Sequence, residues 1–248
     1  MTGSYGVRVV LASASPRRAD VLRMLGLSFR TVPAGVEERL GKVESPHGYV
    51  ERLSREKVLQ VMAGYPDSLV IGGDTVVVLD GRVLEKPTGP PEAVEMLTSL
   101  AGRTHRVYSG LAVAANGKVE SRVARASVTF CPITRDLIER YVETGEPLDK
   151  AGSYGIQGYG AALVDRVEGD YFTVVGMSVA ALVGILPRVG LEYRPGAIVP
   201  LPVREEEDSG EQGGSAGEAG LSEEEALLRE GAPTERVVPS DERVREDA

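Results

Sequence analysis

The feature that most constrains this chain is the alternation of apolar runs with helix-like segments along most of its length. The first apolar run, Val7 to Ala12, is continuous, as in a strand that is buried on both faces. The next residues favour a helix start, because Ser15 is a good N-cap and Pro16 suits the first helical position. Gly26 then provides a natural stop. Repeated along the chain, this alternation predicts an α/β or α+β body built around one mixed sheet.

Two short motifs indicate how neighbouring strands connect. Asn116-Gly117 stands between two strand-like runs, and this dipeptide is the strongest short signal for a β-hairpin. Gly72-Gly73-Asp74-Thr75 interrupts the apolar stretch from Leu69 to Leu79, which predicts two strand-like runs there. The remaining expected elements are helices from about Pro46 to Gly64, Pro91 to Leu100, Thr134 to Gly145 and Val179 to Leu186, and strands over Val107 to Ala115, Val119 to Phe130, Ala161 to Val167 and Tyr171 to Val175.

The acidity of the chain is confined to its C-terminal end. The formal net charge is −9, but residues 204–248 carry −10 and residues 1–203 carry +1. The acidic segment is rich in Glu, Gly and Ser and has no aromatic residue. It cannot bury enough apolar surface to offset an ordering cost of roughly 1–2 kcal/mol per residue. We therefore expect a folded domain over residues 1–195 and a disordered acidic tail over residues 196–248.

Composition argues against several protein classes. The single Cys131 cannot form an intramolecular disulfide, which fits a reducing compartment. No apolar run approaches the roughly 18 residues of a membrane span, and the N-terminus shows no secretory leader. The near-neutral body has no basic patch motif for nucleic acid. The expectation is a cytoplasmic protein that binds neither membrane nor nucleic acid.

The first candidate site lies where the first expected strand meets its helix, in Ser13-Ala-Ser15-Pro-Arg17-Arg18. Free N–H groups and the positive end of the helix dipole favour an anion at such a place. Arg17 and Arg18 add forked donors that match phosphate oxygens. The alternative is a capped helix that carries two surface arginines, and the residues alone leave both interpretations open.

Asp74 is the second candidate, because a carboxylate inside an apolar run is costly unless it is paired or bound to a metal. The two glycines before it permit close approach of another group. The alternative is that Asp74 merely closes a turn between two strands. Lys86, in the rigid loop before Pro87, is a further candidate, whereas Lys57 and Glu38 taken singly resemble a solvated helix face and a surface acid.

The glycine-rich segment from Asp149 to Gly158 is another candidate site. Three glycines with polar residues between them are typical of a loop that contacts a ligand closely. Gln157 within it carries both a donor and an acceptor, which can read the edge of a base. The alternative is a glycine-rich connection without any chemical use.

Taken in order, these segments closely resemble the Maf family of nucleoside triphosphate pyrophosphatases. The resemblance extends from about residue 8 to about residue 188. Each motif alone is weak, but the ordered set is specific. The matching stretches are Leu11 to Arg18, Val36 to Glu38, Arg55 to Lys57, Ile71 to Thr75, Leu84 to Pro87, Leu100 to His105, Glu146 to Gly158 and Val167 to Gly176.

The resemblance implies a Maf/ITPase-like, two-lobed α/β fold with a mixed, extended sheet, helices on its faces and a central cleft. It implies hydrolysis of a nucleoside triphosphate to the monophosphate and pyrophosphate, and it suggests a homodimer. Arg17, Thr75 and Gln157 match the branch of the family that prefers dTTP and UTP. Two departures, Gly73 in place of a common Ala and Met177-Ser178 in place of Leu-Pro, are expected to touch no catalytic group.

The expected chemistry combines this resemblance with the needs of triphosphate hydrolysis. In the family the residue matching Asp74 is the proton acceptor, and we expect Asp74 to activate water against the α-phosphorus. Asp74 and Glu38 are expected to share Mg²⁺ or Mn²⁺ as hard oxygen ligands. The other candidates divide between the phosphates, assigned to Ser13, Arg18, Lys57 and Lys86, and selection of the base, assigned to Arg17, Thr75 and Gln157.

Two other functions are compatible with the sequence. One is a nucleotide-binding regulator of septum formation and cell-division arrest with little catalysis. The combination of Asp74, Glu38, Lys57 and Lys86 favours an enzyme instead, because a binding protein needs no base. The other is a pyrophosphatase for modified pyrimidine nucleotides such as 5-methyl-UTP, which the same pocket residues would accept. A separate hypothesis is that the acidic tail recruits a basic partner.

Overall fold

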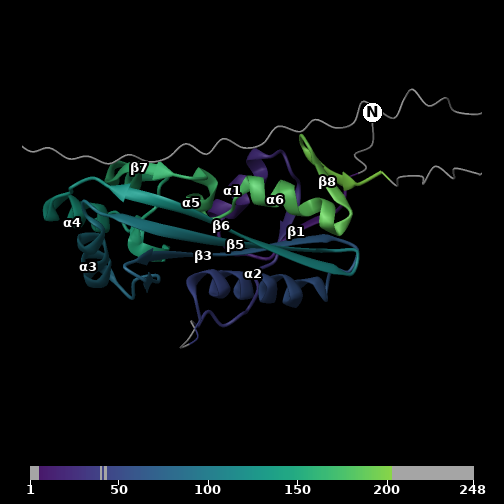
Figure 1. The fold of residues 1–248 in the computed structure, drawn as a ribbon, viewed down its shortest axis with the longest axis horizontal. Coiled ribbons are helices and arrows are strands. Elements are labelled where there is room, and N and C mark those ends of the chain that lie inside the picture. Colours follow the sequence, from purple (N-terminus) through teal and green to yellow (C-terminus); the bar gives the residue numbers. More distant parts are fainter. Residues whose placement is uncertain (1–5, 40, 42–43, 203–248) are drawn as a thin grey trace, which may run out of the picture. The chain divides into compact units, whose positions relative to one another are not determined.

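The computed structural model describes residues 6–39, 41 and 44–202, and within them a mixed sheet of seven strands dominates (Figure 1). Its order is β2-β1-β3-β5-β6-β7, and β4 pairs with the end of β3. The strands are β1 (Val9–Leu11), β2 (Phe29–Thr31), β3 (Leu69–Leu79), β4 (Arg82–Leu84), β5 (Thr104–Ala115), β6 (Lys118–Phe130) and β7 (Val164–Glu168).

Three long antiparallel strands, β3, β5 and β6, form the middle of this sheet, and the shorter β1 and β2 add to it in parallel. The expected hairpin is confirmed between β5 and β6. Asn116 and Gly117 have φ angles of 54° and 73°, as a two-residue turn with both central residues in the left-handed region requires. The mixed sheet expected from the sequence is therefore present, with β3 at its centre.

Helices cover both faces of the sheet. In Figure 1, α2 lies on one face along β3 and β5, while α1, α5 and α6 lie on the other. The helices are α1 (Pro16–Met24), α2 (Pro46–Met62), α3 (Pro90–Leu100), α4 (Arg135–Glu143), α5 (Tyr171–Val175) and α6 (Val179–Ile185); short 3₁₀ turns span Glu146–Asp149, Ala151–Ser153, Gly158–Leu163 and Leu186–Val189, and a separate strand pair is formed by β8 (Leu191–Arg194) and β9 (Ala197–Pro200).

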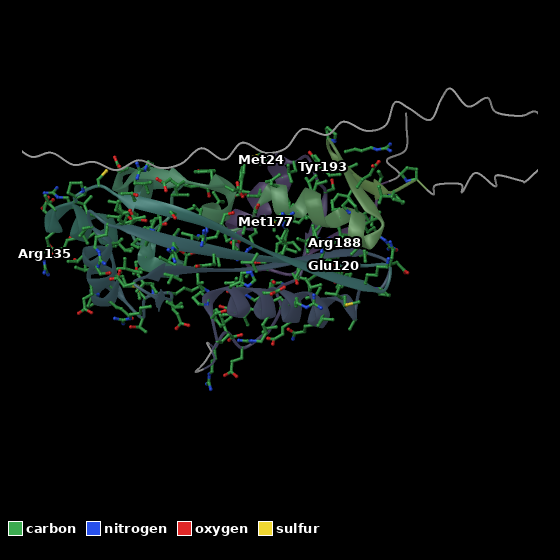
Figure 2. All side chains as sticks on the ribbon, viewed as in Figure 1. Met24, Glu120, Arg135, Met177, Arg188 and Tyr193 are labelled. Atoms are coloured by element: carbon green, nitrogen blue, oxygen red, sulfur yellow. The ribbon has the colours of Figure 1, made fainter. Side chains whose placement is uncertain are left out.

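Among the apolar clusters of the described residues, the two largest lie toward opposite ends of the long strands, and two smaller ones lie between α2 and the sheet. The first core joins β1, α1 and α6, and Met177 is buried in it, whereas Met24 at the end of α1 is exposed (Figure 2). The second core joins α3, α4 and the other end of the sheet. Strand β3 contributes Ile71 to the first core and Val77 to the second. The residues between them, including Asp74, therefore lie where the two lobes meet.

Two local expectations are wrong. The stretch from Leu69 to Leu79 is one continuous strand, so Asp74 does not close a turn. Tyr171–Val175 is a short helix and not a strand. Its β-branched and aromatic residues favour a strand, but Asp170 caps the helix by accepting hydrogen bonds from the Phe172 N–H and the Thr173 hydroxyl.

The folded body continues past residue 195, where the tail was expected to begin. Strand β9 pairs with β8, and the Val7 N–H donates to the Ile198 carbonyl at 2.8 Å. The expected disordered segment from residue 203 onward lies outside the described residues. Among the residues described, no helix is both long and apolar enough to cross a membrane.

Candidate functional site

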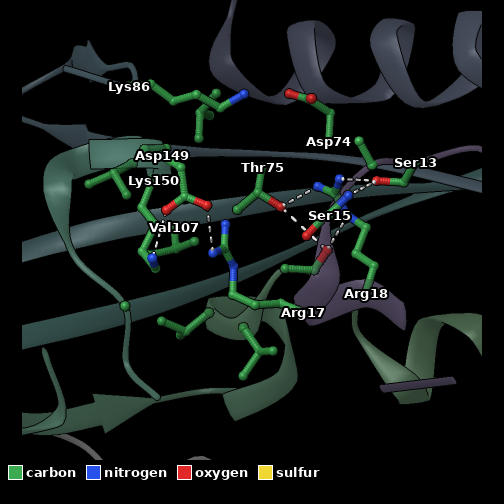
Figure 3. A pocket seen from close by; sticks show the side chains of 18 of the residues that line it. Ser13, Ser15, Arg17, Arg18, Asp74, Thr75, Lys86, Val107, Asp149 and Lys150 are labelled. Carbon is green, nitrogen blue, oxygen red and sulfur yellow. Dashed lines mark hydrogen bonds and ion pairs between the residues drawn. The ribbon is translucent and has the colours of Figure 1, made fainter. Parts of the chain in front are cut away.

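A cleft of about 530 Å³ opens between the two lobes (Figure 3). It is bordered by the β1–α1 loop, the loop after β2, two positions of α2, the middle of β3, the loop after β4, the segment between α4 and β7 and the end of α5. All of the candidate residues named from the sequence line this cleft: Ser13, Arg17, Arg18, Glu38, Lys57, Asp74, Thr75, Lys86 and Gln157. Segments that are far apart in the chain are thus brought to one place.

A buried ion pair forms the centre of the cleft. Lys57 Nζ donates to Asp74 Oδ1 at 2.7 Å and to Glu38 Oε1 at 2.5 Å, and both Lys57 and Asp74 are buried. Lys86 Nζ lies 3.6 Å from Glu38 Oε2. Burial alone would raise the pKa of Glu38, but the hydrogen bond from Lys57 and the charges of Lys57 and Lys86 outweigh it, so this pKa lies below its ordinary value.

Two glycines explain how α2 brings Lys57 onto β3. A Cβ atom on Gly110 would lie 2.1 Å from the Val50 carbonyl oxygen, and one on Gly72 would lie 2.7 Å from Val58 Cγ2. Because neither Cβ exists, the backbone of α2 rests directly on the sheet. This contact sets the position of Lys57 beside Asp74. The spacing of the two residues in the sequence did not predict that they pair.

Arg18 joins the β1–α1 loop to β3 and to the end of α5 from within the cleft (Figure 3). Its Nε donates to the Gly176 carbonyl at 2.9 Å, Nη1 to Ser13 Oγ at 3.0 Å, and Nη2 to Thr75 Oγ1 at 3.1 Å. Burial lowers the pKa of Arg18, and the nearby Asp74 carboxylate opposes that shift. Of the five N–H donors of a guanidinium, three are hydrogen-bonded to the described residues.

The start of α1 differs from expectation at its N-cap. Ser15 makes no side-chain cap, and its own N–H donates to Ser13 Oγ at 3.2 Å. The uncapped N-terminus borders the cleft, which favours an anion there. At Gly73, one of the two departures from the family, a Cβ atom would lie 3.1 Å from Arg18 Nε, a residue assigned to the phosphates.

The opposite side of the cleft is formed by the segment that contains Asp149, Lys150 and Gln157, and Arg17 reaches toward it from α1. Arg17 Nη1 lies 3.7 Å from Asp149 Oδ2, and Lys150 Nζ donates to Asp149 Oδ1 at 2.7 Å (Figure 3). Burial would raise the pKa of Asp149, but the hydrogen bond and charge of Lys150 and the charge of Arg17 lower it below its ordinary value. Gln157 lines the same side with an exposed side chain.

Several residues that line the cleft were given no individual role from the sequence. Asp149 and Lys150 stand in the glycine-rich segment that contains Gln157. Their nearness to Gln157 in the sequence could have indicated that they line the site. Nothing in the sequence indicated that Tyr49 lines the cleft, because an aromatic residue on the apolar face of a helix predicts a core residue. Burial, with Asp74, Glu85 and Glu38 nearby, raises the pKa of Tyr49.

His105 is buried beside the second core. Its Nε2 is hydrogen-bonded to the Tyr154 hydroxyl at 2.8 Å, and its ring packs edge-on against Phe130. Burial lowers the pKa of His105 to about 4. His105 therefore supports Tyr154, which lines the cleft, and does not itself line it.

The carboxylates of the cleft fit a hard divalent cation only in part. Within the described residues, no three side chains among His, Cys, Asp and Glu form a cluster that could hold a metal ion. Asp74 and Glu38 supply two carboxylates, and Mg²⁺ is commonly bound by one or two carboxylates completed by substrate phosphates and water. Lys57 Nζ stands between these carboxylates in this structure. The donor set therefore suits a cation that arrives with phosphate oxygens.

Comparisons with known proteins identify relatives over the two-lobed body. A family model described as Maf-like protein matches residues 8–189. The dTTP/UTP pyrophosphatase of Moorella thermoacetica is 50% identical over 187 residues, which are 75% of this chain and 96% of that relative. The dTTP/UTP pyrophosphatase of Bacillus cereus strain AH820 is 42% identical over 185 residues, which are 75% of this chain and 97% of that relative.

Solved structures give a more distant likeness. The nucleoside-triphosphatase / dITP/XTP pyrophosphatase of Mycobacterium abscessus aligns with a TM-score of 0.37 and 12% identity, covering 73% of this chain and 94% of that one. A likeness at this level assigns no substrate. The family match ends at residue 189, just before β8, so it covers the cleft and all of its lining residues.

Proposed function

The chain belongs to the Maf family, and from this premise we infer that it is a nucleoside triphosphate pyrophosphatase that hydrolyses dTTP and UTP to the monophosphate and pyrophosphate. The observation that carries this function is the cleft itself. It combines a buried carboxylate–lysine–carboxylate group with a separate side of polar residues suited to a base. The names of relatives at 42% and 50% identity supply the substrate class.

Asp74 is the proposed general base. It sits on a rigid central strand at the junction of the lobes, and Lys57 compensates its buried charge. A water molecule beside the carboxylate would be activated by proton transfer to Asp74 as it attacks the α-phosphorus. Lys57 and Lys86 would stabilise the negative charge that grows on the departing pyrophosphate, and Ser13 and Arg18 would bind phosphate oxygens at the uncapped start of α1.

We propose that Asp74 and Glu38 hold Mg²⁺ or Mn²⁺ together with the substrate. When bound, such an ion supplies Lewis-acid stabilisation of phosphoryl oxygens and makes a bound water more acidic. Lys57 Nζ lies between the two carboxylates, so the ammonium must turn toward the phosphates for both carboxylates to face a cation. The phosphates of the nucleotide offer Lys57 the alternative acceptors that this movement requires.

Base selection is assigned to Arg17, Thr75 and Gln157. Uracil and thymine present the same edge of O2, N3–H and O4, so one glutamine amide can serve both. Cytosine reverses the donor and acceptor at N3 and N4, which leaves the glutamine mismatched, and an unpaired polar group in a binding site is costly. Modified pyrimidines with an unchanged edge, such as 5-methyl-UTP, are proposed as further substrates for the same reason.

A panel of triphosphates assayed for pyrophosphate release, with Mg²⁺ and with Mn²⁺, tests this function. We expect dTTP and UTP to be hydrolysed and CTP, dATP and GTP to be poor substrates. Release of single phosphate ions in place of pyrophosphate would contradict attack at the α-phosphorus. Equal rates for purines would contradict the base assignment. A homodimer and a cytoplasmic location stay predictions, as does a link to cell-division arrest.

A further inference from the structure

The segment that carries Gln157 has little regular structure of its own. It begins after α4, where Gly145 turns the chain with a φ of 74°, and runs through three short 3₁₀ turns to β7. Gln157 lies between Gly155 and Gly158, and Gly158 also has a positive φ, of 73°. Such backbone does not hold one conformation without support, because glycine loses more conformational freedom on ordering than other residues.

One carboxylate supports the residues that follow Gln157. Glu146 Oε2 accepts a hydrogen bond from the Tyr159 N–H at 3.0 Å, and Oε1 accepts one from the Gly160 N–H at 3.1 Å. A Cβ atom on Gly158 would lie 2.6 Å from Glu146 Oε2, so the chain passes the carboxylate in close contact. Hydrogen bonds from backbone N–H groups to an ionised carboxylate are stronger than those between neutral groups.

One phenol supports the residues that precede Gln157. Tyr141, near the end of α4, is buried and accepts a hydrogen bond from the Gly155 N–H at 3.1 Å. Its own hydroxyl proton goes to Glu146 Oε1 at 2.9 Å. Burial raises the pKa of Tyr141, so the phenol keeps this proton at neutral pH. Both flanks of Gln157 are therefore fixed to one hydrogen-bonded pair.

We propose that Tyr141 and Glu146 are positioning residues for base selection: they clamp residues 155–160 so that the Gln157 amide meets the pyrimidine edge. Neither residue lines the cleft, so neither contacts the nucleotide directly. A glutamine amide that is free to rotate with its loop could present its donor or its acceptor to either pyrimidine. By fixing residues 155–160, the clamp makes the Gln157 amide select between the edges of uracil and cytosine. This inference rests on the proposed function.

The test compares kcat/KM for UTP and CTP, which differ only at the base edge. We expect Tyr141→Phe to lower the UTP-to-CTP ratio about tenfold, the worth of one or two hydrogen bonds. The kcat for UTP should stay within about twofold, because the phosphate-binding side is untouched. In a Gln157→Ala background, Tyr141→Phe should change the ratio less than about twofold, since the positioned group is gone.

Tyr193→Phe is the matched control, because it also removes a hydroxyl that makes a hydrogen bond within the fold, here by donating to the Leu25 carbonyl at 3.0 Å, away from Gln157. It should leave the ratio unchanged. If Tyr141→Phe does not fold, Glu146→Gln carries the test, since it removes one of the two acceptors that hold Tyr159 and Gly160. An unchanged ratio in the folded variant, or a fall that persists in the Gln157→Ala background, would overturn the inference.

Failure of the proposed function has a different signature. A wild-type enzyme without any preference for UTP over CTP would contradict base selection and the clamp with it. A wild-type enzyme with the preference, whose Tyr141 and Glu146 variants retain it, would contradict the clamp alone. Hydrogen exchange on the wild-type protein adds a measurement independent of activity. The Gly155, Tyr159 and Gly160 amides should exchange slowly, and exchange at unstructured-chain rates would overturn the clamp.

Discussion

The two sides of the cleft are held in place by different means. The side that faces the phosphates, which we call the phosphate wall, consists of Ser13, Arg18, Lys57 and Asp74. Each of these residues stands on or next to a regular strand or helix and is buried. The opposite side, which we call the base wall, is the segment of residues 149–157 that carries Gln157, and in it 3₁₀ turns and side-chain hydrogen bonds replace regular structure. The other two residues assigned to the base, Arg17 and Thr75, stand on α1 and β3.

This difference matches the tasks assigned to each wall. Transfer of a proton to Asp74 and stabilisation of pyrophosphate require groups fixed relative to one another, and rigid elements provide that. Selection of a base requires a surface that can be altered without disturbing the chemistry. A wall fixed by a few side-chain contacts can change its specificity while β3 and α2 stay in place. Substitutions on the two walls should therefore affect different kinetic constants.

The largest effect is expected from Asp74→Asn. The amide cannot accept the proton of the attacking water, so kcat should fall about a thousandfold while nucleotide affinity is kept. Asp80→Asn is the control, because Asp80 lies just past the same strand with an exposed side chain paired to Arg103. Single-turnover kinetics and nucleotide titrations separate the two constants. Full turnover in Asp74→Asn would remove this residue from the role of base.

Gly110→Ala should have the next largest effect, because it breaks the phosphate wall without changing a site residue. The new Cβ would overlap the Val50 carbonyl and push α2 away from β3, which moves Lys57 from Asp74. We expect turnover to fall about a hundredfold, as for a misplacement of about 1 Å, and stability to fall by about 3 kcal/mol.

The matched control for this change is Gly64→Ala, just beyond α2, where the nearest atom to an added Cβ is 3.8 Å away. Chemical denaturation and turnover are measured on both variants. Wild-type turnover in a stably folded Gly110→Ala protein would contradict the account of how α2 places Lys57.

Arg17→Ala should weaken the contact between the two walls. Its pairing with Asp149 at 3.7 Å is partly exposed, so the stability should change by less than about 0.5 kcal/mol. The KM for UTP should rise about tenfold if Arg17 contacts the nucleotide, with kcat little changed. Arg23→Ala, on the same helix and paired to Asp20 on the surface, should change neither constant. A fall in kcat alone would place Arg17 with the phosphate wall.

The smallest effect on turnover is expected from His105→Gln, which instead alters the pH dependence of stability. An unfolded histidine has a pKa of about 6.5, and burial lowers the pKa of His105 to about 4. Between these pH values the unfolded chain binds a proton that the folded protein does not. The stability that His105 contributes is therefore full above about pH 6.5 and is lost as the pH falls toward 4, by roughly 3 kcal/mol.

Denaturation curves from pH 7 to pH 4 measure this contribution. The wild-type protein should lose more stability over that range than His105→Gln, because the glutamine cannot titrate. Parallel losses in the two proteins would show that His105 takes up its proton without penalty, in contradiction to its burial beside Phe130 and Tyr154.

The same contrast explains what the sequence could predict. Periodicity and capping located β1, α2 and the β5–β6 hairpin, and every candidate residue lines the cleft, those on regular elements and those in loops alike. Helix α5 was missed because its residues favour strands and only the Asp170 cap makes them helical. The pairing of Lys57 with Asp74 depends on the close approach at Gly72 and Gly110, which joins segments distant in the chain.

Almost nothing in the sequence indicated that Tyr141 and Glu146 hold the base wall in place. Tyr141 has the spacing of an ordinary buried helix residue, and Glu146 follows a helix end as a surface acid would. Their role depends on hydrogen bonds to backbone N–H groups of Gly155, Tyr159 and Gly160, which any residue type can supply. Side-chain to backbone contacts of this kind have no residue pattern that could be recognised in advance.

The most direct test of the division between the walls is kcat/KM for UTP and for CTP in the wild-type protein, Asp74→Asn and Gln157→Ala. We predict that Asp74→Asn lowers both values by the same large factor and leaves their ratio unchanged. Gln157→Ala should lower the ratio about tenfold with little change in kcat for UTP. A Gln157→Ala enzyme that loses UTP and CTP hydrolysis equally would contradict the assignment of base selection to a separate wall.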